Sequence, residues 1–123
     1  MARTPSTMLP LGTIAPDFNL TNVNGQKLTL ADVRTQAGLV VMFISNHCPF
    51  VIHIKEELAR FAREFGPAIG MVAIGSNDIE AYPQDGPGAM RKDHSEYGYT
   101  FPYLLWPIYF SALTPQNPVE LKL

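Results

Sequence analysis

The sequence predicts an α/β fold in which a central, mostly parallel sheet is flanked by helices. Segments 39–44 and 69–75 are apolar or glycine throughout, as central parallel strands are when helices cover both faces of the sheet. Between them, residues 48–65 carry apolar side chains at spacings of three and four, which indicates a helix. Strand, helix and strand together form a βαβ unit, whose crossover is nearly always right-handed.

A β-hairpin is expected ahead of this unit. Segments 15–20 and 26–30 flank Asn24-Gly25, two residues that both tolerate positive φ and favour a tight turn. A short helical turn is expected over 31–34. Residues 1–11 show no pattern and predict a flexible arm, so the domain is expected to span 12–106.

The apolar stripe of helix 48–65 predicts which of its residues face the core. The stripe consists of Val51, Ile54, Leu58, Phe61 and Phe65. Charged residues of the helix, Lys55 among them, are expected on its surface. The large aromatic residues are expected to build the core; they are Phe43, Phe50, Phe61, Phe65, Tyr103 and Trp106.

Shorter elements follow the second apolar strand. Residues 76–88 are rich in Asp, Pro and Gly and predict a loop. Its acidic residues are expected in solvent; they are Asp78, Glu80 and Asp85. A helix is expected over 89–97 and a strand over 101–106, where Pro102 favours a sheet edge or a strand start.

The last residues, 107–123, contain three prolines and no clear period, so they predict an atypical tail. Within the tail, 119–123 alternates like one short strand. The apolar residues around Trp106 need burial, and the tail is expected to pack on the sheet or to pair with a second chain as a homodimer.

Composition excludes several classes of function. A net charge of −2 with no basic stripe argues against nucleic acid as a partner. Residues 1–10 lack the order of a secretory signal, and no apolar run approaches the roughly 20 residues that span a membrane. A single cysteine rules out an internal disulfide framework. A soluble, cytoplasmic domain of 123 residues is expected.

Cys48 is the candidate reactive residue, because it stands where an apolar strand gives way to a helix. Unpaired N–H groups and the dipole at a helix N-terminus favour the thiolate, which is the nucleophile of thiol chemistry. Pro49 fits the first turn of a helix. His47 is a neighbouring donor or charge, and Ser45 can donate a hydrogen bond to the thiolate.

The catalytic candidates are therefore Cys48, Ser45 and His47. The candidates for contact with substrate are Asn46, Pro49 and Phe50. The alternative is that Cys48 is a small, inert core residue, since free cysteine is among the most buried residue types.

No metal or cofactor is expected. Cys48, His47 and His53 lack the spacing of metal ligands on one helix face. His53 and His94 are expected to be surface or half-buried residues. Gly86-Pro87-Gly88 is too short and too rich in proline for a phosphate-binding loop.

Several motifs resemble the thioredoxin-like redoxins of the alkyl hydroperoxide reductase and thiol-specific antioxidant family. They are Ala15-Pro16-Asp17-Phe18, the Asn24-Gly25 hairpin, Ser45-Asn46-His47-Cys48-Pro49-Phe50, and Ser76-Asn77-Asp78 with Tyr82-Pro83. The central motif is similar to the Cys-Asn-His-Cys-Pro-Phe of a bacterial group. The resemblance covers about residues 10–106 and implies a thioredoxin fold and thiol-based redox chemistry.

The chain departs from the family's pattern at the first cysteine. Ser45 stands where a dithiol enzyme has its attacking cysteine, so Cys48 matches the second, resolving one. The resulting Ser-x-x-Cys also resembles the peroxiredoxin motif. However, Val41 replaces the proline of that motif, and the downstream activating arginine has no counterpart after Arg91.

A second departure is the shortened C-terminal half. After Phe101-Pro102-Tyr103-Leu104 the family implies a helix, a Thr-Pro loop facing the active site and a closing pair of strands. Thr114-Pro115 is a candidate for a displaced version of that loop.

Two functions remain open at this point. In the first, Cys48 is oxidised by peroxide to a sulfenic acid or forms a mixed disulfide with glutathione or a partner protein, and an external thiol then restores it. In the second, the domain is a non-catalytic thioredoxin-like binding or scaffold module. The reactivity of Cys48 in the folded protein distinguishes them.

Overall fold

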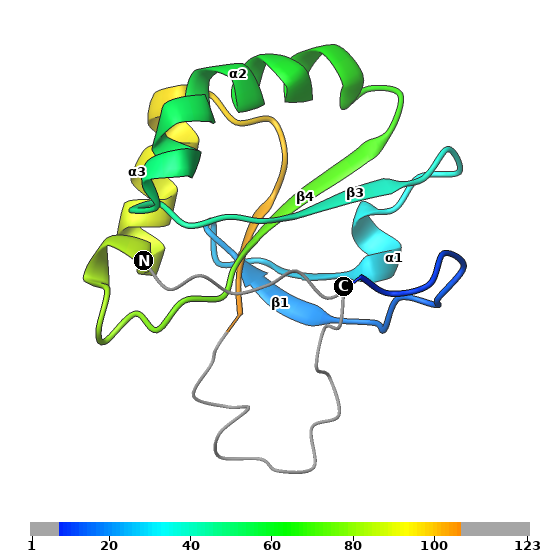
Figure 1. Cartoon of the computed structure of the whole chain (residues 1–123), viewed down its shortest axis with the longest axis horizontal. Helices are drawn as coiled ribbons and strands as arrows, with labels where there is room; N and C mark the ends of the chain where they lie inside the picture. Colours follow the sequence, from blue (N-terminus) through cyan, green and yellow to red (C-terminus); the bar gives the residue numbers. More distant parts are fainter. Residues whose placement is uncertain (1–7, 107–123) are drawn as a thin grey trace, which may run out of the picture.

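The computed structural model describes residues 8–106, and a five-stranded sheet forms its centre. Helices α2 (Pro49–Phe65) and α3 (Pro87–Tyr97) lie on one side of the sheet, and the short α1 (Leu30–Val33) lies on the other (Figure 1). This arrangement confirms the predicted α/β architecture. The expected tail over 107–123, with Thr114-Pro115, and most of the expected arm lie outside the described residues.

The predicted hairpin is present. Its strands are β1 (Asn19–Asn22) and β2 (Lys27–Thr29), which pair antiparallel. Gly25 has a φ of 87° in the turn, and its N–H donates to the Asn22 carbonyl at 2.9 Å. The first strand begins at Asn19 and not at Ala15, because residues 15–18 run ahead of the paired region.

The two apolar segments form parallel strands. They are β3 (Leu39–Phe43) and β4 (Gly70–Gly75), in register from Leu39 opposite Gly70 to Phe43 opposite Ile74. Every residue of β4 is buried. The final strand, β5 (Tyr103–Leu105), pairs parallel with β4 and antiparallel with β1.

Within residues 8–106, segment 39–44 forms the outermost strand, and its predicted central position depends on residues outside this range. The strand order is β2-β1-β5-β4-β3, so β3 lies at the edge, and β4 and β5 occupy the interior. The apolar pattern of β3 reports that both its faces are covered, and it carries no information on whether a strand pairs along its outer edge.

Pro102 marks a strand start and not a sheet edge. It directly precedes β5, which lies between β1 and β4, so of the two predicted positions the strand start is confirmed. A proline at this position removes no ladder hydrogen bond inside the strand. Its carbonyl still accepts the N–H of Ala73 at 2.9 Å.

Side chains alternate between two apolar clusters, one on each face of the sheet. The cluster under α2 and α3 includes Ala59, Ala62, Met71, Ala73, Met90 and Tyr103. The cluster on the α1 face includes Phe18, Leu20, Val72, Ile74 and Leu104. Neighbouring residues of β4 and β5 therefore serve opposite faces, as the period of two in a strand requires.

The buried face of α2 differs from the predicted stripe. Its buried residues are Lys55, Ala59 and Ala62, whereas Ile54 and Phe65 are 45% and 41% exposed. Lys55 was expected on the surface; it is buried and binds the Asp93 carboxylate of α3 at 2.5 Å. Small alanines let α2 approach the sheet and α3 closely, and this close packing turns the helix away from the orientation that its largest apolar residues suggest.

Several of the aromatic residues expected in the core are exposed. Phe43 and Phe50 are 42% and 71% exposed, whereas Tyr103 is fully buried. The aromatic content of the sequence therefore overstates the core of the described residues.

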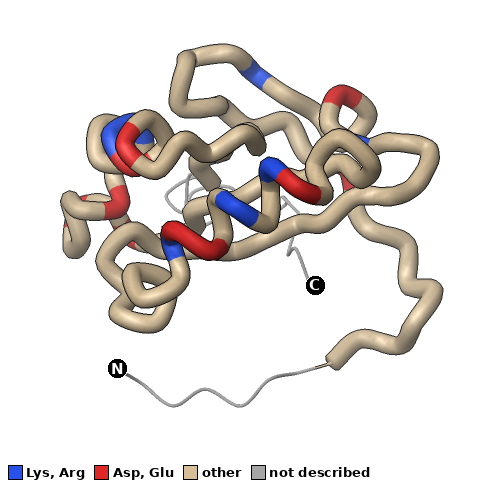
Figure 2. The backbone as a smooth tube through the Cα atoms, turned by 90° about the horizontal axis from the view of Figure 1, so that it is seen from above, with Lys and Arg blue, Asp and Glu red and all other residues tan. Residues whose placement is uncertain are grey.

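Charged positions are interleaved by sign along α2 (Figure 2), so the helix carries no surface of a single charge.

The segment between β4 and β5 is more structured than expected. The loop contains a 3-10 turn, η1 (Pro83–Asp85), and α3 begins at Pro87, two residues earlier than predicted. Gly98 ends α3 with a φ of 67°, the left-handed conformation common after helices. No helix within residues 8–106 has the length and apolar character needed to cross a membrane.

Candidate functional site

The site lies where β3 ends and α2 begins, at the carboxyl edge of the parallel strands. The same edge carries the loop that follows β4, and η1 brings Asp85 from that loop under the β3–α2 connection. Asp85 is only 3% exposed, so its expected position in solvent is wrong. The loop folds back because this carboxylate is satisfied by groups of the 45–47 turn.

The Asp85 carboxylate binds four groups. It accepts hydrogen bonds from Ser45 Oγ at 3.0 and 3.1 Å, from the Asn46 backbone N–H at 2.7 Å and from Asn77 Nδ2 at 2.7 Å. His47 Nδ1 lies 2.6 Å from Asp85 Oδ2. A buried carboxylate with this many partners is held firmly in one position.

These contacts decide the charge of Asp85. Burial raises the pKa of the Asp85 carboxyl, but hydrogen bonds from Asn77, Ser45 and Asn46, with the nearby His47, outweigh burial. The pKa therefore lies below its ordinary value, and the group is an anion at neutral pH. The site is built around one buried negative charge.

His47 is oriented by this anion. With its Nδ1 on Asp85, the neutral ring carries its lone pair at Nε2, on the side away from the carboxylate. The ring also stacks on Tyr82, with centroids 4.6 Å apart and an angle of 9° between the planes. Its side chain is 31% exposed, so a proton can be exchanged with solvent or with a bound molecule.

Asn46 holds the turn together. It is buried, its Nδ2 donates to the Gln84 carbonyl at 2.9 Å, and its Oδ1 accepts from the Tyr103 hydroxyl at 2.8 Å. Burial, with the charge of Asp85, raises the pKa of Tyr103 above its usual range, so this hydroxyl keeps its proton and donates. The Asn46 side chain therefore links the 45–47 turn to β5 and to the Asp85 loop.

Cys48 is the N-cap residue of α2 and is partly exposed. Its carbonyl accepts the first helical hydrogen bond, from Ile52 at 2.9 Å, and its thiol does not cap the helix. Pro49 occupies the first turn as predicted. Pro49 and Phe50 are both exposed beside the thiol, which leaves an open, partly apolar approach to sulfur.

The chain matches the AhpC/TSA family model over residues 11–106. The chain belongs to the AhpC/TSA family. The structure and this match together confirm the redoxin resemblance drawn from the motifs and the thioredoxin-like fold that it implied.

Two solved structures are similar to this AhpC/TSA chain over most of its length. An uncharacterised conserved protein of Geobacillus kaustophilus is 46% identical, with a TM-score of 0.79, over 89% of this chain and 62% of the other. A hypothetical protein of Sinorhizobium meliloti 1021 is 39% identical, with a TM-score of 0.80 and the same coverage. This chain therefore spans less than two thirds of the length of both structures.

A secreted disulfide oxidoreductase of Mycobacterium tuberculosis is 25% identical, with a TM-score of 0.58, over 72% of this chain and 59% of that one. A thiol:disulfide interchange protein of Chlorobium tepidum is 17% identical, with a TM-score of 0.63, and the match covers 83% of this chain and 64% of that protein. At this identity the likeness shows the fold alone. No curated protein matches the chain significantly.

One residue of the AhpC/TSA site, Asp85, is not among the candidates predicted from the sequence. The Ser76-Asn77-Asp78 and Tyr82-Pro83 segments match the family's motifs, yet the polar composition of the loop predicts that Asp85, which Asn77 binds, lies in solvent. One signal was available, because polar loops that follow neighbouring parallel strands meet at the same sheet edge. The two other acidic residues of the loop, Asp78 and Glu80, are exposed as expected.

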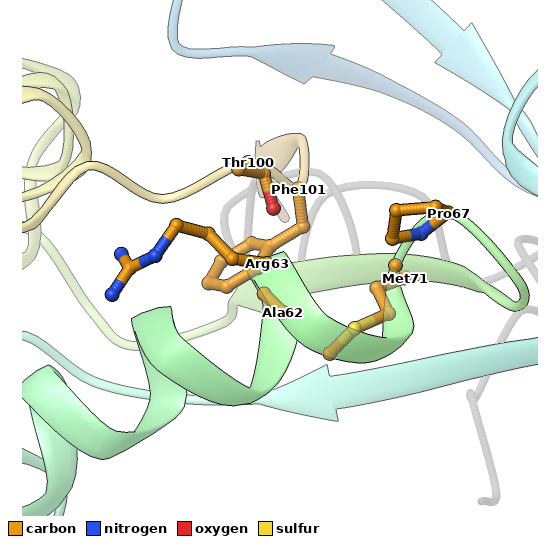
Figure 3. A pocket seen from close by; sticks show the side chains of 7 residues that line it. Ala62, Arg63, Pro67, Met71, Thr100 and Phe101 are labelled. Atoms are coloured by element: carbon orange, nitrogen blue, oxygen red, sulfur yellow. The ribbon is translucent and has the colours of Figure 1, made fainter.

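The remaining candidates lie outside the site. His53 is exposed, and His94 is half-buried with Nε2 2.8 Å from the Phe101 carbonyl, as expected for both. Residues 8–106 contain no cluster of three or more side chains able to hold a metal ion. One pocket lies at the far end of α2, between the helix and the Thr100–Phe101 segment (Figure 3).

That pocket is separate from the thiol. It is lined by Ala62, Arg63, Gly66, Pro67, Met71, Thr100 and Phe101. Cys48 caps the opposite end of the 17-residue helix, about 25 Å away at 1.5 Å per residue. The chemistry of the AhpC/TSA site is therefore that of an open thiol, an oriented imidazole and a buried carboxylate.

Proposed function

We propose that the protein is a thiol redox protein that works with a single cysteine. The observation that carries the proposal is the position of Cys48. It is partly exposed at the N-terminus of a long helix, next to a histidine whose ring is oriented by the buried Asp85 anion. Unpaired N–H groups of the first helical turn stabilise a thiolate, which is the reactive form of cysteine.

The proposed cycle consists of three balanced steps. The Cys48 thiolate attacks the terminal oxygen of a hydroperoxide, the O–O bond breaks, and the products are a sulfenic acid and an alkoxide that takes up a proton as the alcohol. An external thiol then condenses with the sulfenic acid and releases water. A second thiol attacks the mixed disulfide, restores Cys48 and leaves as the oxidised thiol.

Mixed-disulfide exchange is the second route within the same proposal. Here the Cys48 thiolate attacks the disulfide of a partner protein or of a small thiol, and one half of that disulfide leaves as a thiolate. His47 serves as the proton donor or acceptor through Nε2, and Ser45 supports Asp85 and not the sulfur. Pro49 and Phe50 would contact the bound molecule.

The proposal includes the reactants of Cys48 and the compartment in which it works. Peroxide, a protein disulfide or a small thiol would be the reactants, in a cytoplasmic setting where free thiols stay reduced. A binding module with an inert Cys48 is the competing function. The hydrogen bonding of Ser45 to Asp85 favours it, because the position of the lost cysteine is now part of the structural network.

The deciding experiment is alkylation of Cys48 with iodoacetamide from pH 5 to 9, in folded and in urea-unfolded protein. We expect the folded protein to react faster than the unfolded protein at pH 6, because the helix N-terminus stabilises the thiolate. Cys48→Ser serves as the blank. Labelling that occurs only after unfolding would replace the redox proposal with the binding module.

A further inference from the structure

Tyr82 is a large side chain that takes no part in the two apolar clusters of the sheet. It directly precedes η1, and 48% of its surface is exposed within residues 8–106. Its ring lies flat on the imidazole of His47, with the centroids 4.6 Å apart and 9° between the planes. Core packing therefore does not account for this tyrosine, and the stacking on His47 is what its position provides.

The backbone fixes Tyr82 in relation to Asp85. The Tyr82 N–H donates to the Asp78 carbonyl at 2.8 Å, and the Tyr82 carbonyl accepts the Asp85 N–H at 3.0 Å. Tyr82 and Asp85 are thus the two ends of one 3-10 turn, in which side chains three residues apart lie on the same side. Asp85 Oδ2 is 2.6 Å from His47 Nδ1. One turn therefore contacts the imidazole twice, at its edge and on its face.

The two contacts restrict different motions of the His47 ring. The outer torsion of a histidine side chain is broad, so a hydrogen bond to Nδ1 leaves the ring free to turn about that bond. A stacked aromatic ring fixes the plane in which the imidazole lies. Ser45 Oγ lies 3.0 Å from the same Nδ1 and adds only to the edge contact. The stack is therefore the contact that decides where Nε2 points.

We propose that Tyr82 is a positioning residue that acts through His47, which rests on the proposed role of His47 as a proton carrier for Cys48. The stack holds Nε2 toward the leaving group of the molecule that the thiolate attacks. The substrates that gain from this are those with a basic leaving group, namely alkyl hydroperoxides and aliphatic disulfides. A leaving group that is stable as an anion needs no proton from Nε2.

The step balances for both substrate classes. With a proton on each ring nitrogen, Nδ1–H stays on Asp85 and Nε2–H faces the substrate. For a hydroperoxide, an S–O bond forms to the terminal oxygen, the O–O bond breaks, and the alkoxide takes the Nε2 proton and leaves as the alcohol. For an aliphatic disulfide, a new S–S bond forms, the old one breaks, and the leaving thiolate takes the proton. The neutral ring regains a proton from solvent.

The size of the effect follows from the geometry of proton transfer. General acid catalysis typically contributes about 10²–10⁴-fold, and it needs heavy atoms within about 2.6–3.2 Å of each other. A displacement of about 1 Å can cost about 10²-fold. Loss of the stack leaves the hydrogen bond to Asp85 in place, so part of the effect survives. We expect a loss of at least about tenfold.

The kinetic test compares Tyr82→Leu with Tyr82→Phe, which keeps an aromatic face. The reagents are cumene hydroperoxide, hydroxyethyl disulfide and dithiodipyridine, whose leaving group is a stable anion. In Tyr82→Leu, the first two should react with Cys48 at least about tenfold more slowly. Dithiodipyridine should react at nearly the wild-type rate. Tyr82→Phe should restore the wild-type rate with all three reagents.

Proton NMR of the histidine rings tests the stack itself. In Tyr82→Leu, the ring protons of His47 should lose the ring-current shift of a stacked neighbour and move toward those of the exposed His53. The ring protons of His94 should not move, and the circular dichroism should be unchanged. In Tyr82→Phe, the His47 signals should stay near their wild-type positions. Unshifted His47 signals in Tyr82→Leu would overturn the stack, and with it the positioning role.

The kinetic outcomes separate this inference from the proposed function. A wild type that reacts with none of the three reagents overturns the redox function, and the role of Tyr82 falls with it. Equal rates in wild type and Tyr82→Leu overturn the role of Tyr82 alone. Equal slowing with all three reagents also overturns it, because the loss would then lie in the thiol. A wild type that reacts only with dithiodipyridine overturns it as well, because no proton is then delivered.

Discussion

At the scale of single residues, the site depends on Asp85. The carboxylate joins Ser45, Asn46 and Asn77 and sets the orientation of His47. One buried anion therefore connects two loops that are 40 residues apart in the chain.

Asp85→Asn should lower the free energy of unfolding by about 1–3 kcal/mol at pH 7, because an amide cannot accept from all four partners and leaves buried donors unpaired. Glu80→Gln, an exposed acid of the same loop, is the matched control and should change stability by under about 0.5 kcal/mol. Urea unfolding measures both. Equal effects of the two variants would contradict a structural role for the Asp85 anion.

The advantage of wild type over Asp85→Asn should depend on pH. The pKa of Asp85 is lowered from 3.8 in the folded protein. The stabilisation by its charge is therefore complete above about pH 4 and is lost as the pH falls through the lowered pKa. Unfolding curves from pH 2 to 7 should show the two variants converging in acid, whereas a constant difference would mean that charge is irrelevant.

Ser45→Cys should restore a dithiol. The introduced thiol would stand three residues before Cys48 at a helix start, the spacing of the bacterial family motif. We expect mild oxidation to remove both free thiols and thioredoxin-type insulin reduction to appear. Because the introduced sulfur lies beside the Asp85 anion, its ionisation is opposed, and the activity should rise toward alkaline pH.

Ser95→Cys supplies the matched control for that change. It adds a second thiol at an exposed position of α3, far from the site in sequence. It should keep two free thiols after mild oxidation. An inactive Ser45→Cys that also keeps both thiols would show that the 45–48 turn no longer has the geometry of a disulfide.

At the scale of secondary structure elements, most of the fold was predictable from the sequence. The strands 39–43 and 70–75 and the helix 49–65 agree with their predicted ranges to within one residue. The spacing of apolar residues and the turn residues depend on neighbouring positions in the chain, so the sequence predicts where these elements begin and end. The position of β3 in the sheet could not be predicted, because apolar faces say nothing of edge pairing.

The buried face of α2 and the burial of Asp85 could not be predicted from the hydrophobic pattern either. Lys55 and Asp85 are charged residues whose burial depends on partners in distant segments, Asp93 and the 45–47 turn. Charge alone predicts exposure. Ser45, His47 and Cys48 could be named as candidates because they follow one strand directly, whereas Asp85 reaches the same turn only through the fold of a loop.

The Lys55–Asp93 pair predicts a large effect between elements. Lys55→Met should lower the free energy of unfolding by about 3–5 kcal/mol, because Asp93, whose side chain is only 15% exposed, is left as an anion without its partner. Lys55→Met combined with Asp93→Leu should recover most of that loss. Arg60→Met removes two exposed ion pairs, with Glu57 and Glu64, and should cost under about 1 kcal/mol. If the double variant is as unstable as the single one, the pair does not act as a unit.

At the scale of the whole molecule, residues 8–106 form one sheet with an apolar cluster on each face, and both β4 and β5 contribute to the two clusters. Unfolding is therefore expected to be a single cooperative transition. Differential scanning calorimetry should give a calorimetric enthalpy equal to the van't Hoff enthalpy. A van't Hoff enthalpy well below the calorimetric one would mean that the two clusters unfold separately.

The solitary thiol of Cys48 has a consequence for equilibrium. A disulfide within one molecule has an oxidised fraction that dilution does not change, because both sulfurs move together. Any disulfide of Cys48 joins two molecules, since the chain has one cysteine. The fraction in that form therefore scales with the concentration of the second thiol as well as with its potential. At a fixed potential, the fraction of Cys48 in a mixed disulfide therefore depends on the total concentration of thiol around the protein.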